Sequence, residues 1–356
     1  MRAMKAKPKV IGFVLLLAVV AAAAIYLLAG GGRRPAALRG YVGGEKIGVL
    51  EDEEIAGIFR NRYGLTLDYA KAGSLDMVTA DLSGQDFLFP SSQTALEYYQ
   101  QLHGQPAKSE IVFNTPLVLY TRRPVLQALA GAGLVREEDG CCYMDMDALA
   151  DALLEGVRWA DLGLEELYGP LAVSTTDPAK SNSGNMFAGL LANVLCGGVA
   201  DAASVQDVLP RLQLIFSRLG YMETSSSDLF DQFLKTGMGA KPLVAGYESQ
   251  LLEFAVQNPE DWAAIGDDIV MIYPSPTVWS AHVFIALDEA GAAGIDALMD
   301  ADVQRLAWEK HGFRTAVSGT GDDAARFGVS GLARQITRVV PMPAYDAMDQ
   351  IITALS

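Results

Sequence analysis

The 356-residue sequence is poor in the residues that most often carry enzymatic or metal chemistry. It contains three cysteines and three histidines, and no Cys-x-x-Cys or Cys/His spacing typical of a metal site. G-x-S-x-G, P-loop and H-E-x-x-H motifs are also absent. We interpret His103 as a surface residue and His282 and His311 as packing or surface residues. The sequence therefore predicts no enzyme, no catalytic residue, no metal and no cofactor.

Basic residues are scarce beyond residue 40. The first forty residues hold seven of the 27 lysines and arginines and none of the 43 acidic residues, which leaves 20 basic against 43 acidic residues in the remainder. A surface with this acidic excess repels nucleic acid and gains nothing from an anionic membrane. An anion site in this chain would have to be local and built from backbone amides and hydroxyls.

One long apolar run lies near the N-terminus. Residues 10–29 are twenty apolar residues without a charge, which is enough to span a bilayer, and the basic tail 1–9 precedes them. The positive-inside rule places this tail in the cytoplasm and the rest of the chain outside. We expect an uncleaved single-pass anchor followed by a linker over residues 30–37. The alternative is a cleaved signal sequence, after which the chain would be secreted.

The cysteines leave two alternatives open. Export permits a disulfide between Cys141 or Cys142 and Cys196. The other alternative is that all three are unpaired and act as small apolar side chains.

Strands alternate with helices along most of the sequence. Strand–turn–helix units are predicted where strands at 38–42, 65–70, 86–89 and 242–245 are followed by polar turns and then by helices. This order is typical of an α/β fold with a parallel sheet covered on both faces. Ligands of such sheets bind at the turns that follow the strands.

Two extended runs, each interrupted by proline, indicate that the chain has two lobes. The first is residues 110–121, and the second is residues 269–277 followed by 282–287. Each is long enough to leave one sheet and enter another. We predict a first lobe from residues 38–118 and 273–356 and a second from residues 119–272, with a ligand in the cleft between them.

The stretch 171–195 carries the main site prediction. Residues 171–173 are expected to form a strand, and a helix follows a loop that contains Ser181, Asn182, Ser183 and Gly184. The first amides of a helix have no partner within it and lie at the positive end of its dipole, so this turn suits an anionic or polar ligand. The alternative is that the loop only caps the helix.

Four segments together resemble the type II periplasmic solute-binding proteins of ABC importers, the group of phosphate, sulfate and molybdate binders. They are TDPAKSNSGNMF (176–187), PLVAGYESQLLEF (242–254), IYPSPTVWSAHVFIAL (272–287) and AWEKHGF (307–313). The resemblance implies a two-lobed protein that captures a small solute, such as an oxyanion, and delivers it to an ABC permease. The positions that match its binding loops are Ser74, Ser91 and Ser92 in the first lobe and Thr176, Ser181, Asn182, Ser183, Gly184 and Tyr247 in the second.

Several alternatives remain at this stage. Glu45 and Lys46 either reach the cleft or form an exposed pair, and Glu248 either faces the cleft or interacts with the start of its helix. Trp279 is a candidate platform for a sugar or another organic solute. The predicted anchor is also compatible with a membrane-anchored sensor or assembly protein that uses the same binding fold.

Overall fold

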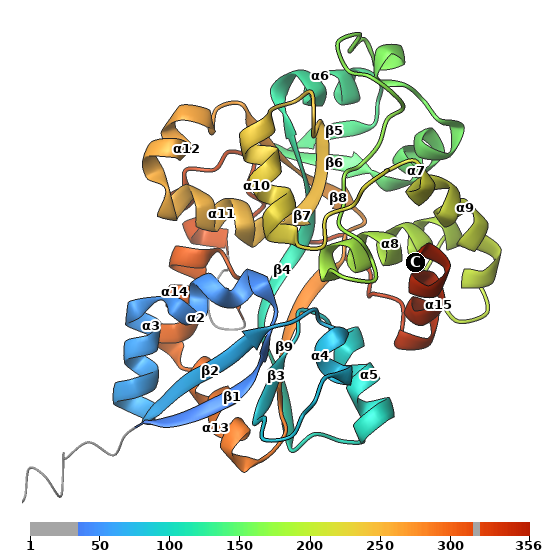
Figure 1. Cartoon of the computed structure of the whole chain (residues 1–356). Coiled ribbons are helices and arrows are strands. Elements are labelled where there is room, and N and C mark those ends of the chain that lie inside the picture. The colour runs from blue at the N-terminus through green and yellow to red at the C-terminus, as the bar shows by residue number, and fades with distance from the viewer. Residues whose placement is uncertain (1–34, 316–320) are drawn as a thin grey trace, which may run out of the picture.

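The computed structural model describes residues 35–315 and 321–356 and shows two α/β lobes joined by long strands (Figure 1). Strand β4 (Lys108–Arg122) belongs to both lobes: its first part pairs with β9 (Trp279–Ala286), and its last part pairs with β7 (Leu243–Tyr247) and β8 (Ile269–Ser275). The two proline-interrupted runs are therefore the connections between lobes, and the predicted two-lobed α/β fold is confirmed.

The sheet of the first lobe has the strand order β2-β1-β3-β9-β4. Strand β1 (Ala36–Val42) runs parallel to β2 (Leu65–Lys71) and to β3 (Phe87–Phe89). Successive residues of β3 alternate between two cores, because side chains along a strand point to opposite faces. Phe87 and Phe89 pack with α3, α13 and α14, whereas Leu88 packs with α4 and α5. The helical segments of this lobe are η1 (Gly44–Lys46), α2 (Ile47–Glu51), α3 (Glu53–Ile58), η2 (Phe59–Tyr63), α4 (Asp76–Thr79), α5 (Gln93–His103), α13 (Glu289–Leu298) and α14 (Ala301–His311).

The second lobe is organised around the last part of β4, which pairs with β7 and β8. Strand β8 runs parallel to β6 (Cys141–Asp145), which forms a hairpin with β5 (Val135–Glu138). Leu117 and Leu119 of β4 face the core shared with α7, α8 and α9, and Val118 and Tyr120 face α10 and α11. The helical segments are α6 (Arg123–Gly131), α7 (Met146–Glu155), η3 (Trp159–Leu162), α8 (Asn182–Cys196), α9 (Val205–Ser217), α10 (Ser226–Thr236), α11 (Glu248–Gln257) and α12 (Pro259–Ile265).

The last part of the chain contains η4 (Gly321–Phe327) and α15 (Tyr345–Leu355). Residues 273–356 are predicted to belong to the first lobe. The buried side chains of α15, however, pack into the core of α8 and α9 in the second lobe, and α15 also contacts α5 of the first. The C-terminal helix therefore links the two lobes on the side of α8 (Figure 1).

Two predicted elements differ from the structure. The apolar residues 171–173 form no strand; only an isolated bridge joins the next residue, Ser174, to Val244. The sequence also predicts a helix near residues 296–310, but the structure has two helices in this region, α13 and α14, because the Asp300 side chain accepts a hydrogen bond from the amide of Asp302 and caps a new helix.

The membrane and cysteine predictions have different outcomes. The predicted anchor at residues 10–29 lies outside the described residues, and no helix within 35–315 and 321–356 is both long and apolar enough to cross a bilayer. All three cysteines are free thiols, so the structure contains the unpaired alternative.

Candidate functional site

A cleft of about 390 Å³ lies between the two lobes. The first lobe contributes the turns that follow β1 and β2, and the second contributes the turns that precede α8 and α10. The lining residues are Gly43, Gly44, Glu45, Lys71, Ala72, Gly73, Ser74 and Asp76 from the first lobe, and Lys180, Ser181, Asn182, Thr224, Ser225, Ser226 and Ser227 from the second. The first-lobe turns follow strands β1 and β2, as the sequence pattern predicts, whereas the second-lobe turns before α8 and α10 follow irregular segments.

Two helices begin at this cleft. Helix α8 starts at Asn182 after Ser181, and α10 starts at Ser226 after Ser225. In the described part of the chain neither Ser181 nor Ser225 caps its own helix by accepting a hydrogen bond from a backbone amide through its side chain. The Gly184 amide of α8 is bound by Thr176 Oγ1, but the amides of Asn182 in α8 and of Ser226 and Ser227 in α10 remain available to a ligand, and both helix dipoles place their positive ends at the cleft.

Two lysines from opposite lobes also line the cleft. Lys71 ends β2 and Lys180 precedes α8, and both side chains are exposed. Within residues 35–315 and 321–356 neither ammonium group forms an ion pair or hydrogen bond, although acidic residues outnumber basic ones in the chain. Two acidic residues, Glu45 and Asp76, also line the cleft, and the Glu45 carboxylate is already paired with Lys46. The negative charge of Asp76 therefore remains against the positive charges of the two lysines. The local balance therefore favours a negatively charged ligand.

The lobes touch directly behind the cleft through Asn182. Its side-chain amide donates to the carbonyl oxygen of Ser91 (2.8 Å) in the first lobe and to the hydroxyl of Tyr247 (3.1 Å) in the second. The same Ser91 carbonyl accepts from the Ser280 hydroxyl (2.8 Å), and the Ser91 amide donates to the Ser74 hydroxyl (3.0 Å). Burial raises the pKa of Tyr247 well above its usual value, so its hydroxyl stays protonated. Asn182 thus joins the two lobes in this conformation.

Lys46 is fully buried at the base of the first lobe's loops, which excludes an exposed Glu45–Lys46 pair. Its ammonium group lies 2.6 Å from Glu45 Oε1, 2.6 Å from Ser91 Oγ and 3.2 Å from His282 Nδ1, with the Phe89 ring centre 5.0 Å away. Burial lowers the pKa of Lys46, and the adjacent Glu45 carboxylate opposes that shift. Lys46 therefore supports the loop that carries Ser91 and does not contact a ligand in the cleft.

The predicted site residues divide into three groups. Ser74, Ser181 and Asn182 line the cleft. Ser92 caps α5 by accepting from the Thr94 amide (3.1 Å). The other five are buried behind the cleft: Ser91, Thr176, Ser183, Gly184 and Tyr247.

Thr176 and Ser183 hold the start of α8 in place. Their hydroxyl oxygens are 2.7 Å apart, and Thr176 Oγ1 accepts from the Gly184 amide (2.8 Å). A Cβ on Gly184 would lie 2.0 Å from the Thr176 carbonyl oxygen, so only glycine allows this close approach. These residues position the loop that lines the cleft.

Glu248 and Trp279, two further candidates from the sequence, do not line the cleft. Glu248 is buried at the start of α11, where Arg314 donates to both of its oxygens (2.6 and 3.0 Å) and the Tyr273 hydroxyl donates at 2.5 Å. Glu248 therefore does not oppose an anion in the cleft, and Trp279, at the start of β9, does not line it. The described residues contain no group of three or more His, Cys, Asp or Glu that could hold a metal ion.

Sequence reasoning did not single out the two cleft lysines or the serines at the start of α10. The Thr224–Asp228 turn is recognisable as polar, but its position opposite the β1 and β2 turns depends on the tertiary fold. Lys180 lies within the stretch identified as the main site, so the one available signal was a basic residue directly before a helix start.

The structure is similar to solved periplasmic binding proteins over nearly its whole length. The sulfate-binding protein SubI from Mycobacterium tuberculosis H37Rv matches with a TM-score of 0.55 and 15% identity over 88% of this chain and 96% of that one. AfuA from Actinobacillus pleuropneumoniae, solved with fructose-6-phosphate, matches with a TM-score of 0.55 and 14% identity over 89% and 97%. A putative extracellular solute-binding protein from Bordetella parapertussis matches with a TM-score of 0.58 and 11% identity over 89% and 96%.

No family model and no curated protein sequence matches the chain. The structural likeness, at these identities, establishes the fold: the chain has the two-lobed fold of the periplasmic solute-binding proteins.

Proposed function

We propose that this chain is an extracytoplasmic solute-binding protein that captures a small anionic solute between its lobes for an ABC-type importer. The observation that carries the proposal is the position of Lys71 and Lys180 on opposite sides of one cleft. Among the described residues neither lysine has an ion partner. The first amide of α8, at Asn182, and the first amides of α10, at Ser226 and Ser227, add donors from the second lobe. Together they supply charge and directed donors for an anion.

The fold supports this proposal and is compatible with more than one class of anion. The similar structures include proteins described as binding sulfate and fructose-6-phosphate, so the same two-lobed frame accommodates both an inorganic and an organic anion. We assign ligand contact to the hydroxyl groups of Ser74 and Ser181 and to the backbone amide of Asn182, whose side chain is already bound to Ser91 and Tyr247. The buried residues Thr176, Ser183, Gly184, Ser91 and Tyr247 position them.

Thermal unfolding with added anions tests the proposal. Sulfate, phosphate, molybdate, tungstate and a sugar phosphate should be compared, because a ligand that binds only the folded state stabilises it by about 2.7 kcal/mol at 100 times its Kd. Lys180→Met should reduce the shift caused by the active anion. The matched control is Lys235→Met, since Lys235 is an exposed lysine of α10 paired with Asp231. If no anion raises the midpoint, or if both variants respond as the wild type does, the proposal is wrong.

We further propose that the predicted span at residues 10–29 holds the binding lobes outside the cytoplasm, near a permease. If the span is cleaved, the lobes are released instead. The N-terminal sequence of the mature protein distinguishes the two, because a tethered protein retains residue 10 and partitions with membranes. A gene neighbourhood with a permease and an ATPase supports import, whereas one with signalling proteins alone favours the sensor alternative.

A further inference from the structure

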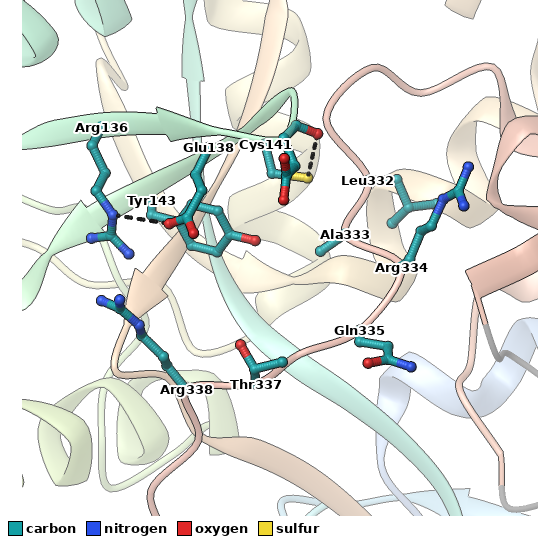
Figure 2. Close-up of a pocket in the computed structure, with 11 residues that line it drawn as sticks. Arg136, Glu138, Cys141, Tyr143, Leu332, Ala333, Arg334, Gln335, Thr337 and Arg338 are labelled. Atoms are coloured by element: carbon teal, nitrogen blue, oxygen red, sulfur yellow. Dashed lines mark hydrogen bonds and ion pairs between the residues drawn. The ribbon is translucent and has the colours of Figure 1, made fainter.

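A second pocket, of about 850 Å³, lies on the second lobe and shares no lining residue with the interlobe cleft (Figure 2). One wall is the β5–β6 hairpin, and the other is the extended segment 332–338. In the hairpin register Arg136 lies opposite Tyr143, and Glu138 lies opposite Cys141. Residues paired in this way point to the same face of the hairpin, so all four face the segment across the pocket.

The second wall is held at both ends. At one end the Ala333 amide donates to the Tyr273 hydroxyl (3.0 Å), and Arg314 donates to the carbonyl oxygens of Ala333 (2.5 Å) and Arg334 (3.3 Å). At the other end the Thr277 amide donates to the carbonyl oxygen of Arg338 (2.9 Å). The pocket is therefore formed before any ligand enters it.

Three arginines line this pocket in a strongly acidic chain. Arg136, Arg334 and Arg338 face two carboxylates, Glu138 and Asp139. Figure 2 shows the Arg136 and Arg338 side chains approaching each other from opposite walls beside the Tyr143 ring. Guanidinium groups repel one another, so their gathering at one pocket favours occupation by an anion.

The arginines are only weakly engaged by the protein itself. Arg136 Nε lies 3.4 Å from Glu138 Oε2, and the two side chains are 37% and 58% exposed, so this ion pair is easily displaced. Arg338 donates to the Ser275 hydroxyl (3.2 Å). Within residues 35–315 and 321–356 the Arg334 guanidinium group makes no hydrogen bond or ion pair.

We propose that this pocket is a second ligand site, which binds a small anion with at least two negative charges, carried by carboxylate or phosphate groups. A guanidinium group binds a carboxylate or phosphate through two parallel hydrogen bonds, and Arg136 and Arg338 supply two such groups. The Arg136 guanidinium carbon lies 5.1 Å from the Tyr143 ring centre, which leaves an aromatic surface beside the charge. The buried side chains of Leu332 and Ala333 add an apolar floor for the body of the ligand.

Calorimetric titration with citrate and with pyrophosphate tests this site. The titration should use the Lys71→Met/Lys180→Met protein, so that heat from the interlobe cleft does not contribute. We expect at least one of the two anions to bind with a stoichiometry of one. Adding Arg136→Gln and Arg338→Gln should weaken binding by about tenfold or more, since charge-assisted hydrogen bonds are lost. The charge-matched control adds Arg211→Gln and Arg305→Gln, two arginines far from the pocket, and should bind as the parent protein does.

Each outcome bears on the proposal. If neither anion binds, or if the two pairs of arginine variants weaken binding equally, the pocket is not a specific anion site. Binding of a hexaglutamate peptide without binding of citrate or pyrophosphate would also overturn it, since the pocket would then recognise an acidic protein segment. If the double pocket variant does not fold, Arg338→Gln alone serves, because Arg338 is exposed, and unchanged affinity in that variant contradicts the proposal.

Discussion

Lys46 offers the sharpest test of how the first lobe's loops are held. The side chain is 0% exposed, and its ammonium group forms an ion pair with Glu45 and contacts Ser91 and His282. Lys46→Met fills a similar volume but leaves the Glu45 carboxylate, itself 9% exposed, without its cation. Removing one partner of a buried ion pair costs about 3–5 kcal/mol, and we expect a loss of about 3 kcal/mol or more in the free energy of unfolding.

Urea unfolding of Lys46→Met, Glu45→Gln and the double variant measures this loss. The double variant should recover most of the stability, because neither charge is then left buried and unpaired. Lys235→Met removes a lysine that is 72% exposed and should leave the midpoint unchanged. If Lys46→Met costs less than about 1 kcal/mol, or if the double variant is as unstable as the sum of the two single variants, the loops do not depend on this ion pair.

Three further predictions concern residues around the cleft. Burial, with a smaller contribution from Lys46, lowers the pKa of His282 well below 6.5, so the folded state keeps it neutral while the unfolded state protonates it. The free energy of unfolding should therefore fall by about 1 kcal/mol between about pH 6.5 and 5.5, and His282→Gln should remove that difference in urea titrations at the two pH values. Gly184→Ala should destabilise the protein by about 1–3 kcal/mol, because its Cβ would lie 2.0 Å from the Thr176 carbonyl oxygen, whereas Gly57→Ala, with no atom within 4 Å, should be neutral or stabilising in the same assay. Asn182→Ala should weaken solute binding about tenfold in calorimetry, since it removes the hydrogen bonds to Ser91 and Tyr247 that join the lobes, and an unchanged Kd would show that closure does not use them.

The cleft loops were predictable because their signals are local. A polar turn followed by a helix start is visible in the sequence at Ser74, after a strand, and again at Asn182, where the expected strand does not form, and the structure brings both turns to one cleft. The two proline-interrupted runs likewise predicted the connections between lobes, since the 15 residues of β4 exceed an ordinary strand and the second run passes from β8 of one lobe into β9 of the other.

The remaining features depend on contacts between distant segments. Nothing local to Lys46 shows that β3 and β9 bury it beneath Ser91 and His282. The turn Asp139–Gly140, in which both residues have positive φ (52° and 76°), joins β5 and β6, a hairpin that the strand–turn–helix pattern does not predict. Leu171 and Val173 are buried, as the residues of a core strand are, yet residues 171–173 form no strand.

In the proposed function, one anion binds between the lobes and contacts side chains of both lobes. Calorimetric titration of two proteins with the anion found active in thermal unfolding tests it most directly. Both proteins carry Arg136→Gln/Arg338→Gln, which removes the second pocket. One retains Lys71 and Lys180, and the other also carries Lys71→Met/Lys180→Met. The account predicts one site in the protein with both lysines and at least tenfold weaker binding without them, because each lysine supplies a charge-assisted contact. Equal affinity in the two proteins would contradict it.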